Sequence, residues 1–188
     1  MKKKILFLGY SSKETKIIDF LKKKNLSVTT IGNKKVNLKL LKKFHLCLSF
    51  GYRKIIGKEI ISNLKRPIIN LHISYLPYNK GSHPNYWSFV KKTPKGVTIH
   101  EMDKGIDTGK IVVQKKVKFR ITKKTTFRDT YYKLRNEIEK LFIKNYKKII
   151  LLKYKSKKQK KIKFSKNKKI SNNFNWNIPI TKHLKNNT

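Results

Sequence analysis

The residues best suited to chemistry lie between Pro67 and Ile111, where an amide and an imidazole stand at the end of an apolar run. Asn70 and His72 are two residues apart, and on a strand this spacing points both side chains to the same face. An amide N–H can donate to a developing oxyanion, and an imidazole can donate or accept a proton. The same pair could equally support the following loop through hydrogen bonds. Spacing alone leaves both interpretations open.

A carboxylate follows the next apolar run, Val97 to Met102. Asp107 stands in the turn GIDTG, where an aspartate commonly bonds its own backbone, and Asp103 is a competing carboxylate nearby. The chain holds only 9 acidic residues against 49 Lys and Arg, which mildly favours a function for those present. Because open α/β sheets place their chemistry at strand ends, we expect Asn70, His72 and Asp107 to share one site.

Other kinds of site are disfavoured. The histidines in this segment have no nearby Cys and no i, i+4 pairing on a helix, so no metal site is predicted. Gly9 lacks the further glycines of a dinucleotide fingerprint. Cys47 is the single cysteine, which excludes an intramolecular disulfide, and its apolar surroundings predict a buried thiol.

The elements that must position these residues alternate between strand and helix, which predicts an α/β fold with a mostly parallel sheet flanked by helices. Ser11 or Ser12 is expected to cap the first helix, and Thr125 or Thr126 the long last one. Strands are expected at residues 4–9, 26–31, 46–50, 67–71, 96–102 and 110–119, and helices at 12–24, 37–43, 58–64, 83–90 and 126–152.

The composition of the chain of 188 residues predicts a main domain, residues 1–152, and a lysine-rich C-terminal extension, residues 153–188. Residues 153–169 are rich in lysine and predict a solvated connector. Four apolar residues are expected to anchor the end back onto the domain: Phe174, Trp176, Ile178 and Pro179.

The net charge of +40 has two interpretations. It could attract nucleic acid or an anionic membrane surface. It could also be compositional drift toward Lys, Ile and Asn, which the even spread of lysines along the chain favours. No apolar segment approaches the roughly 18–20 residues of a membrane span, and the apolar run near Met1 is too short for a signal peptide, so a cytoplasmic protein is expected.

Two stretches resemble the folate-dependent formyltransferase superfamily: NLHISYLPYNKG from Asn70 and GVTIHEMDKGIDTGKI from Gly96. Asn-x-His, a Leu-Pro loop ending in Gly, Gly-Val-Thr-x-His and Asp-x-Gly occur together, within a similarity that covers roughly residues 3–119. The resemblance implies a Rossmann-like catalytic domain, and it favours the catalytic interpretation of the three polar residues.

By this resemblance the chemistry would be transfer of a formyl group from 10-formyltetrahydrofolate to an amine, without a metal. Asn70 and protonated His72 would stabilise the tetrahedral oxyanion. Asp107 would keep His72 charged and oriented and would help to move the amine proton, since a nearby carboxylate favours the imidazolium.

The resemblance also implies where the pterin would lie. It would contact the backbone of two loops: Arg53, Lys54, Ile55 and Ile56, and Asp103, Lys104, Gly105 and Ile106. The Leu76-Pro77 bond is a candidate for the cis form.

The identity of the amine that accepts the formyl group rests on shorter stretches of sequence. The segment from Pro84 to Phe89 resembles sugar formyltransferases, which favours a nucleotide-linked amino sugar. Tyr86 and Trp87 could stack on such a ligand, but helix core is the favoured interpretation. An aminoacyl-tRNA is the second acceptor, water (formyl-folate hydrolysis) the third, and an inactive folate- or polyanion-binding module the alternative outside enzymes. A homodimer is left open.

Overall fold

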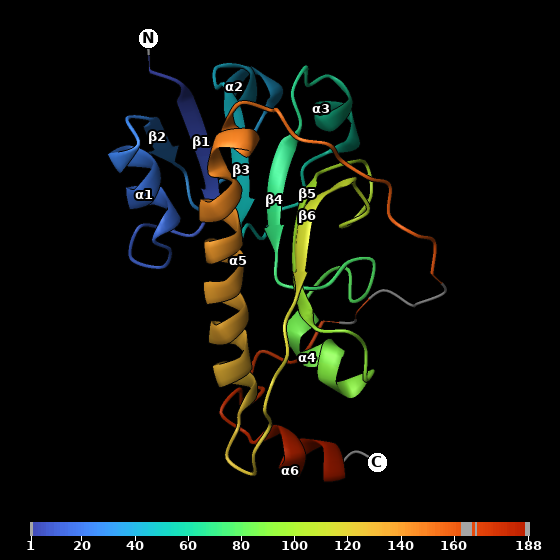
Figure 1. The fold of residues 1–188 in the computed structure, drawn as a ribbon. Coiled ribbons are helices and arrows are strands. Elements are labelled where there is room, and N and C mark those ends of the chain that lie inside the picture. The colour runs from blue at the N-terminus through green and yellow to red at the C-terminus, as the bar shows by residue number, and fades with distance from the viewer. Residues whose placement is uncertain (1, 163–166, 168, 187–188) are drawn as a thin grey trace.

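The computed structural model describes residues 2–162, 167 and 169–186, which form one six-stranded sheet with helices on both faces (Figure 1). The strand order is β2-β1-β3-β4-β5-β6. The pairs β1–β2, β1–β3 and β3–β4 are parallel, and the pairs β4–β5 and β5–β6 are antiparallel. The strands are β1 (Lys4–Gly9), β2 (Ser27–Thr30), β3 (Leu46–Phe50), β4 (Ile68–His72), β5 (Gly96–Glu101) and β6 (Ile111–Lys116). The expected α/β class with a mostly parallel sheet is confirmed.

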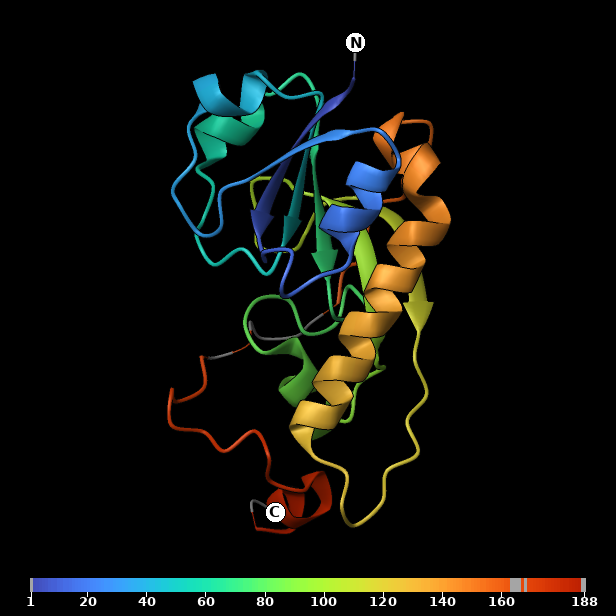
Figure 2. The same ribbon diagram turned by 90° about the vertical axis from the view of Figure 1, so that its left-hand side faces the viewer.

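Figure 2 shows the sheet between two layers of helices. On one face lie α1 (Ile17–Lys23) and the long α5 (Phe127–Ile150), and on the other lie α2 (Leu38–Lys42) and α3 (Lys58–Ser62). Two further helices, α4 (Pro84–Val90) and α6 (Ile180–Lys185), lie near the N-terminal end of α5. None of the helices in the part of the chain that the structure describes is long and apolar enough to cross a membrane.

Successive side chains of the central strands point to opposite faces of the sheet, so each helix layer packs on its own apolar cluster. In β1, Ile5 and Phe7 belong to the apolar cluster shared with α1 and α5, whereas Leu6 and Leu8 belong to the cluster beneath α2 and α3. All four side chains are fully buried, because a central strand covered on both faces has no solvated side.

The predicted N-cap residue is wrong for α1 and correct for α5. Neither Ser11 nor Ser12 caps α1, which begins after Lys16; the Ser11 N–H and hydroxyl instead donate to the Glu14 carboxylate in a preceding turn. The expected cap was wrong because Glu14 offers Ser11 a closer partner. Thr126 caps α5 in a capping box with Asp129, as predicted.

The C-terminal extension packs against the domain at two places. Phe174, Trp176 and Ile178 join an aromatic and aliphatic cluster around Phe127, which confirms the expected anchor. The expectation of a solvated connector was wrong for residues 154–159, which bond to the β5–β6 side of the sheet. Residues 163–166 and 168 of the lysine run lie outside the described residues.

Candidate functional site

Asn70, His72 and His100 lie on the face of the sheet opposite α5. Asn70 and His72 alternate on β4 with Ile69 and Leu71, whose side chains belong to the core beneath α5. The predicted shared face of Asn70 and His72 is therefore confirmed. His100 on β5 lies directly opposite Asn70 in the antiparallel register, so their side chains are neighbours on that face.

Asp107 reaches these residues from the loop between β5 and β6. Because β5 runs antiparallel to β4, its last residue, Glu101, lies beside Ile69, and the loop must turn back to bring Asp107 to the end of β4. Asp107 itself has φ 52°, a left-handed backbone that aspartate adopts more readily than most residues.

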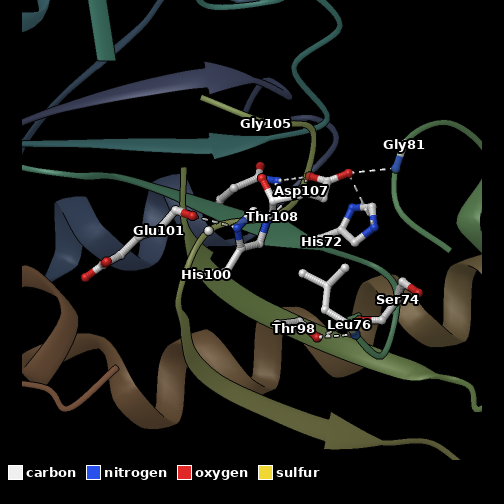
Figure 3. Close-up of polar contacts among 12 residues, drawn as sticks. His72, Ser74, Leu76, Gly81, Thr98, His100, Glu101, Gly105, Asp107 and Thr108 are labelled. Carbon is white, nitrogen blue, oxygen red and sulfur yellow. Dashed lines mark hydrogen bonds and ion pairs between the residues drawn. The ribbon is translucent and has the colours of Figure 1, made fainter. Parts of the chain in front are cut away.

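The Asp107 carboxylate is the centre of the site, and Figure 3 shows the side chains around it. One oxygen, Oδ1, lies 3.3 Å from Asn70 Nδ2 and 3.4 Å from His100 Nε2. The other, Oδ2, accepts the Gly81 N–H at 2.8 Å and lies 3.7 Å from His72 Nε2. The structure thus brings Asn70, His72 and Asp107 together, as the sequence predicted.

The orientation of His100 fixes that of Asn70. His100 Nδ1 lies 2.7 Å from the Glu101 carbonyl oxygen, which can only accept, so Nδ1 carries a proton. The other nitrogen, Nε2, lies 3.1 Å from Asn70 Nδ2. Asn70 Nδ2 is therefore within hydrogen-bond distance of both His100 and Asp107.

Burial opposes the charged form of His72 that the resemblance implied. It lowers the pKa of His72, and the Asp107 carboxylate opposes that effect without overcoming it. His72 is 8 % exposed, so an imidazolium there loses most of its hydration, which favours the neutral form. Neutral His72 keeps its proton on Nε2, which faces the Asn79 carbonyl oxygen at 3.4 Å and Asp107 Oδ2.

Asp107 stays ionised. Burial by itself would raise the pKa of Asp107, but His72, His100 and the Gly81 N–H together hold it well below its usual range. The site therefore combines a neutral imidazole that can accept a proton with a fixed carboxylate that stabilises the imidazolium once formed.

The competing carboxylate has a different place. Asp103 Oδ1 accepts the Gly105 N–H at 3.0 Å and the Thr108 hydroxyl, so Asp103 shapes the loop from within. The local backbone bond that the sequence allowed for Asp107 is instead made by Asp103, which accepts the Gly105 N–H.

The loop after β4 is fixed by a polar residue of β5. Thr98 donates its hydroxyl to the Ser74 carbonyl oxygen and accepts the Leu76 N–H, and the following Leu76-Pro77 bond is cis, as predicted. This arrangement carries the chain to Gly81, whose N–H bonds Asp107.

Sequence reasoning missed two contributors, His100 and the Gly81 N–H. A signal for His100 was present, because Thr98 and His100 are alternate polar residues in an otherwise apolar strand, the same signal that identified Asn70 and His72. No local signal identified Gly81, which enters through its backbone.

The two loops expected to hold a pterin flank this site. Ile55 is 87 % exposed and Ile106 46 % exposed, which is unusual for large apolar side chains, and Ile56 and Met102 belong to one apolar cluster that joins the loops. The Arg53 N–H already donates to Asn33 Oδ1 at 2.7 Å, so this backbone donor is engaged within the protein.

Backbone donors remain in the same loops. Among the residues that the structure describes, the N–H groups of Lys54, Ile55 and Ile56 have no hydrogen-bond partner, and the loop thus suits a planar ligand with ring acceptors. Within the same part of the chain, no group of three His, Cys, Asp or Glu side chains could hold a metal ion.

Comparison with known proteins places this arrangement in a family. The model of the family described as formyl transferase matches residues 37–146. The chain belongs to the formyl transferase family. The motifs of this formyl transferase from Asn70 to Asp107 lie inside the matched range.

Solved relatives cover most of the formyl transferase chain. The formyltransferase PseJ from Anoxybacillus kamchatkensis, in complex with UDP-4,6-dideoxy-4-formamido-L-AltNAc and tetrahydrofolate, is 39 % identical with a TM-score of 0.83, and the match covers 95 % of this chain and 96 % of PseJ. An N-formyltransferase from Helicobacter canadensis, in complex with folinic acid and dTDP-3-aminofucose, is 26 % identical with a TM-score of 0.65, covering 89 % and 71 % of the two chains.

Curated relatives are longer than the region they share with this chain. The bifunctional polymyxin resistance protein ArnA from Wigglesworthia glossinidia brevipalpis is 39 % identical over 47 % of this chain and 14 % of its own length. A methionyl-tRNA formyltransferase from Desulforamulus reducens is 40 % identical over 36 % of this chain and 22 % of its own length. The matched segment is thus a small part of each of these proteins.

Proposed function

We propose that this protein transfers the formyl group of 10-formyltetrahydrofolate to the primary amine of a nucleotide-linked amino sugar. One observation carries the proposal: the buried cluster of Asn70, His72 and Asp107 lies in a chain that aligns along nearly its whole length with PseJ, a formyltransferase solved with a formamido nucleotide sugar and tetrahydrofolate.

His72 is the proton carrier in this proposal. The amine nitrogen attacks the formyl carbon, the carbonyl electron pair moves to oxygen, and neutral His72 accepts the proton that the amine releases. Asp107, 3.7 Å away, stabilises the imidazolium. Collapse of the intermediate breaks the bond to N10 of the folate, which takes the proton from His72 as tetrahydrofolate leaves.

Asn70 supplies the hydrogen bond to the oxyanion. Of its two amide contacts, the one to Asp107 Oδ1 is the longer, 3.3 Å against 3.1 Å to His100. An oxyanion that forms beside Nδ2 competes for this hydrogen, whereas the shorter contact with His100 keeps the amide in place. Donors that are fixed before reaction are the most effective stabilisers of developing charge.

The pterin of the co-substrate would lie across the loops 53–56 and 103–106. The exposed side chains of Ile55 and Ile106 offer it an apolar surface, and the N–H groups of Lys54, Ile55 and Ile56 offer hydrogen bonds. The other predicted contacts would come from backbone groups that make no hydrogen bond within the loops. The residues concerned are Arg53, Asp103, Lys104 and Gly105.

The proposal is tested by incubating the protein with 10-formyltetrahydrofolate and a panel of UDP- and dTDP-linked amino sugars and measuring tetrahydrofolate release. Asn70→Asp, which removes the amide donors at constant size, and His72→Gln should each abolish most of the turnover. Asn172→Asp, the same chemical change at an exposed position, should leave it intact. Turnover that survives Asn70→Asp and His72→Gln would refute these roles.

A second acceptor is tested in one arm of the same experiment. The net charge of +40 would favour an aminoacyl-tRNA, and formyl-methionyl-tRNA is detected by acid gel electrophoresis. Formylation of tRNA without any amino-sugar turnover would replace the sugar by the tRNA as acceptor. Tetrahydrofolate release without any amine would indicate hydrolysis, and folate binding without turnover an inactive module.

A further inference from the structure

The lysine-rich extension contributes one side chain to the loop that carries Asp107. After α5 the chain crosses to the β5–β6 side of the sheet (Figure 1). There Lys157 forms an antiparallel bridge with Ile111, with N–H to O distances of 2.8 and 2.9 Å in the two directions. This bridge fixes residues 154–159, which we name the strap, at the start of β6.

Gln159 of the strap bonds the backbone on both sides of Thr108. Its Nε2 donates one hydrogen to the Asp107 carbonyl oxygen and the other to the Gly109 carbonyl oxygen, each at 2.8 Å. Gln159 Oε1 is buried and has no hydrogen-bond partner among the described residues, so the bonds of this side chain to the protein run through its amide nitrogen. The reverse amide orientation would place three oxygens together, so the orientation is unambiguous.

Tyr154 adds a second contact from the strap. Its hydroxyl donates to Glu101 Oε1 at 3.1 Å, at the last residue of β5. The strap is therefore bonded at β5, at the loop after it and at β6, and the Asp107 loop is held at both ends.

The loop needs such support for a physical reason. It turns back from an antiparallel strand and places Asp107 at a positive φ. The Asp107 carboxylate must also keep its distances of 3.3 Å to Asn70 Nδ2, 3.7 Å to His72 Nε2 and 2.8 Å to the Gly81 nitrogen. Among the described residues, the Asp107 and Gly109 carbonyl groups have no backbone donor, and they accept their hydrogen bonds from Gln159.

We propose that Gln159 is a positioning residue for formyl transfer, acting through the backbone of Asp107 to hold the catalytic carboxylate in register with His72. This inference rests on the proposed function of Asn70, His72 and Asp107. It also makes the strap, residues 154–159, part of the working active site.

A matched pair of variants separates the hydrogen bonds from the bulk of the side chain. Gln159→Met keeps the length and removes both donors, whereas Gln159→Lys restores donors that reach both carbonyl oxygens. Gln159→Met should lower kcat by about 10- to 100-fold, the range expected when a catalytic group is displaced by up to about 1 Å. KM for the folate should stay within about twofold, and Gln159→Lys should recover most of kcat. Lys160→Met, at the exposed neighbouring position, should match wild type.

A double-mutant cycle tests whether Gln159 acts through Asp107. In the Asp107→Asn background Gln159→Met should cost less than about twofold further, because the group it positions has already been removed. An equal loss in both backgrounds, or wild-type kcat for Gln159→Met, would overturn the proposal.

A readout without activity keeps this inference separate from the proposed function. The Gly81 N–H bonds Asp107 Oδ2, so its hydrogen exchange reports how well Asp107 is held. Exchange at Gly81 should be several-fold faster in Gln159→Met, and unchanged in Lys160→Met and in Gln159→Lys. Faster exchange in a protein that formylates no amine would refute the function and leave the positioning role standing; unchanged exchange would refute the positioning role.

Discussion

Replacing Asp107 by Asn removes one charge from the centre of the site while keeping its shape. The amide introduced by Asp107→Asn retains an oxygen for the Gly81 N–H, which in the native protein donates to Asp107 Oδ2 at 2.8 Å. The loop should therefore keep its bond to Gly81, whereas the new amide nitrogen takes the place of Oδ1 and cannot accept the hydrogen bond from Asn70 Nδ2. The main loss is the negative charge beside His72.

The size of the effect follows from the separation of 3.7 Å between Asp107 Oδ2 and His72 Nε2. Two unit charges at that distance attract by about 4 kcal/mol at an effective dielectric constant of about 20. The side chains of His72 and Asp107 are only 10 % and 14 % exposed, so salt screens this attraction weakly. If His72 becomes charged in the transition state, the loss is roughly 10³-fold in kcat, because each 1.36 kcal/mol is about tenfold.

Tetrahydrofolate release at saturating substrates measures this loss directly. Asp19→Asn, at an exposed position of α1, makes the same chemical change and should leave kcat at the wild-type value. Circular dichroism should show the same helix content in all three proteins. A kcat for Asp107→Asn within about fivefold of wild type would refute a charged His72 in the transition state.

Three further predictions concern stability. The pKa of Asp107 is depressed, so its ionisation stabilises the native state above the unfolded-state pKa of aspartate, and this contribution is lost as the pH falls through the native pKa. Asp107→Asn should therefore lower Tm at pH 7, with a gap to wild type that closes in acid; a constant gap would contradict the depressed pKa. Thr126→Ala removes the capping box of α5 and should cost about 1 kcal/mol, or roughly 2–4 °C in Tm by calorimetry, against no change for Thr29→Ala on the exposed edge strand β2. Phe142→Ala should cost about 3–5 kcal/mol in urea unfolding, because Phe142 is a residue of α5 that is fully buried in the core, whereas Tyr132→Ala at a 52 % exposed position of the same helix should cost far less.

Local pattern was sufficient for most of the fold. It predicts strand β3 at its observed residues, because five consecutive apolar or small residues between polar segments specify a buried strand. It predicts the start of α1 too early, because the choice between Ser11 as a cap and Ser11 in a turn with Glu14 depends on competition between neighbouring side chains.

The sequence by itself determined that Asn70 and His72 share a face, because the period of two along a strand is a property of the backbone. It also supplied the motifs by which Asp107 joins them. Only the tertiary structure decided how deeply His72 is buried, and this burial lowers its pKa against the attraction of Asp107 that the sequence suggested.

Contacts between distant segments were likewise beyond the sequence. His100 meets Asn70 through the antiparallel register of β5, and Gln159 reaches the Asp107 loop from 52 positions along the chain. A lysine-rich segment has no periodicity that marks one glutamine as different. The edge of β6 and the carbonyl groups of the Asp107 loop need hydrogen-bond partners. Folding brings the strap to β6 and places Gln159 beside these carbonyl groups.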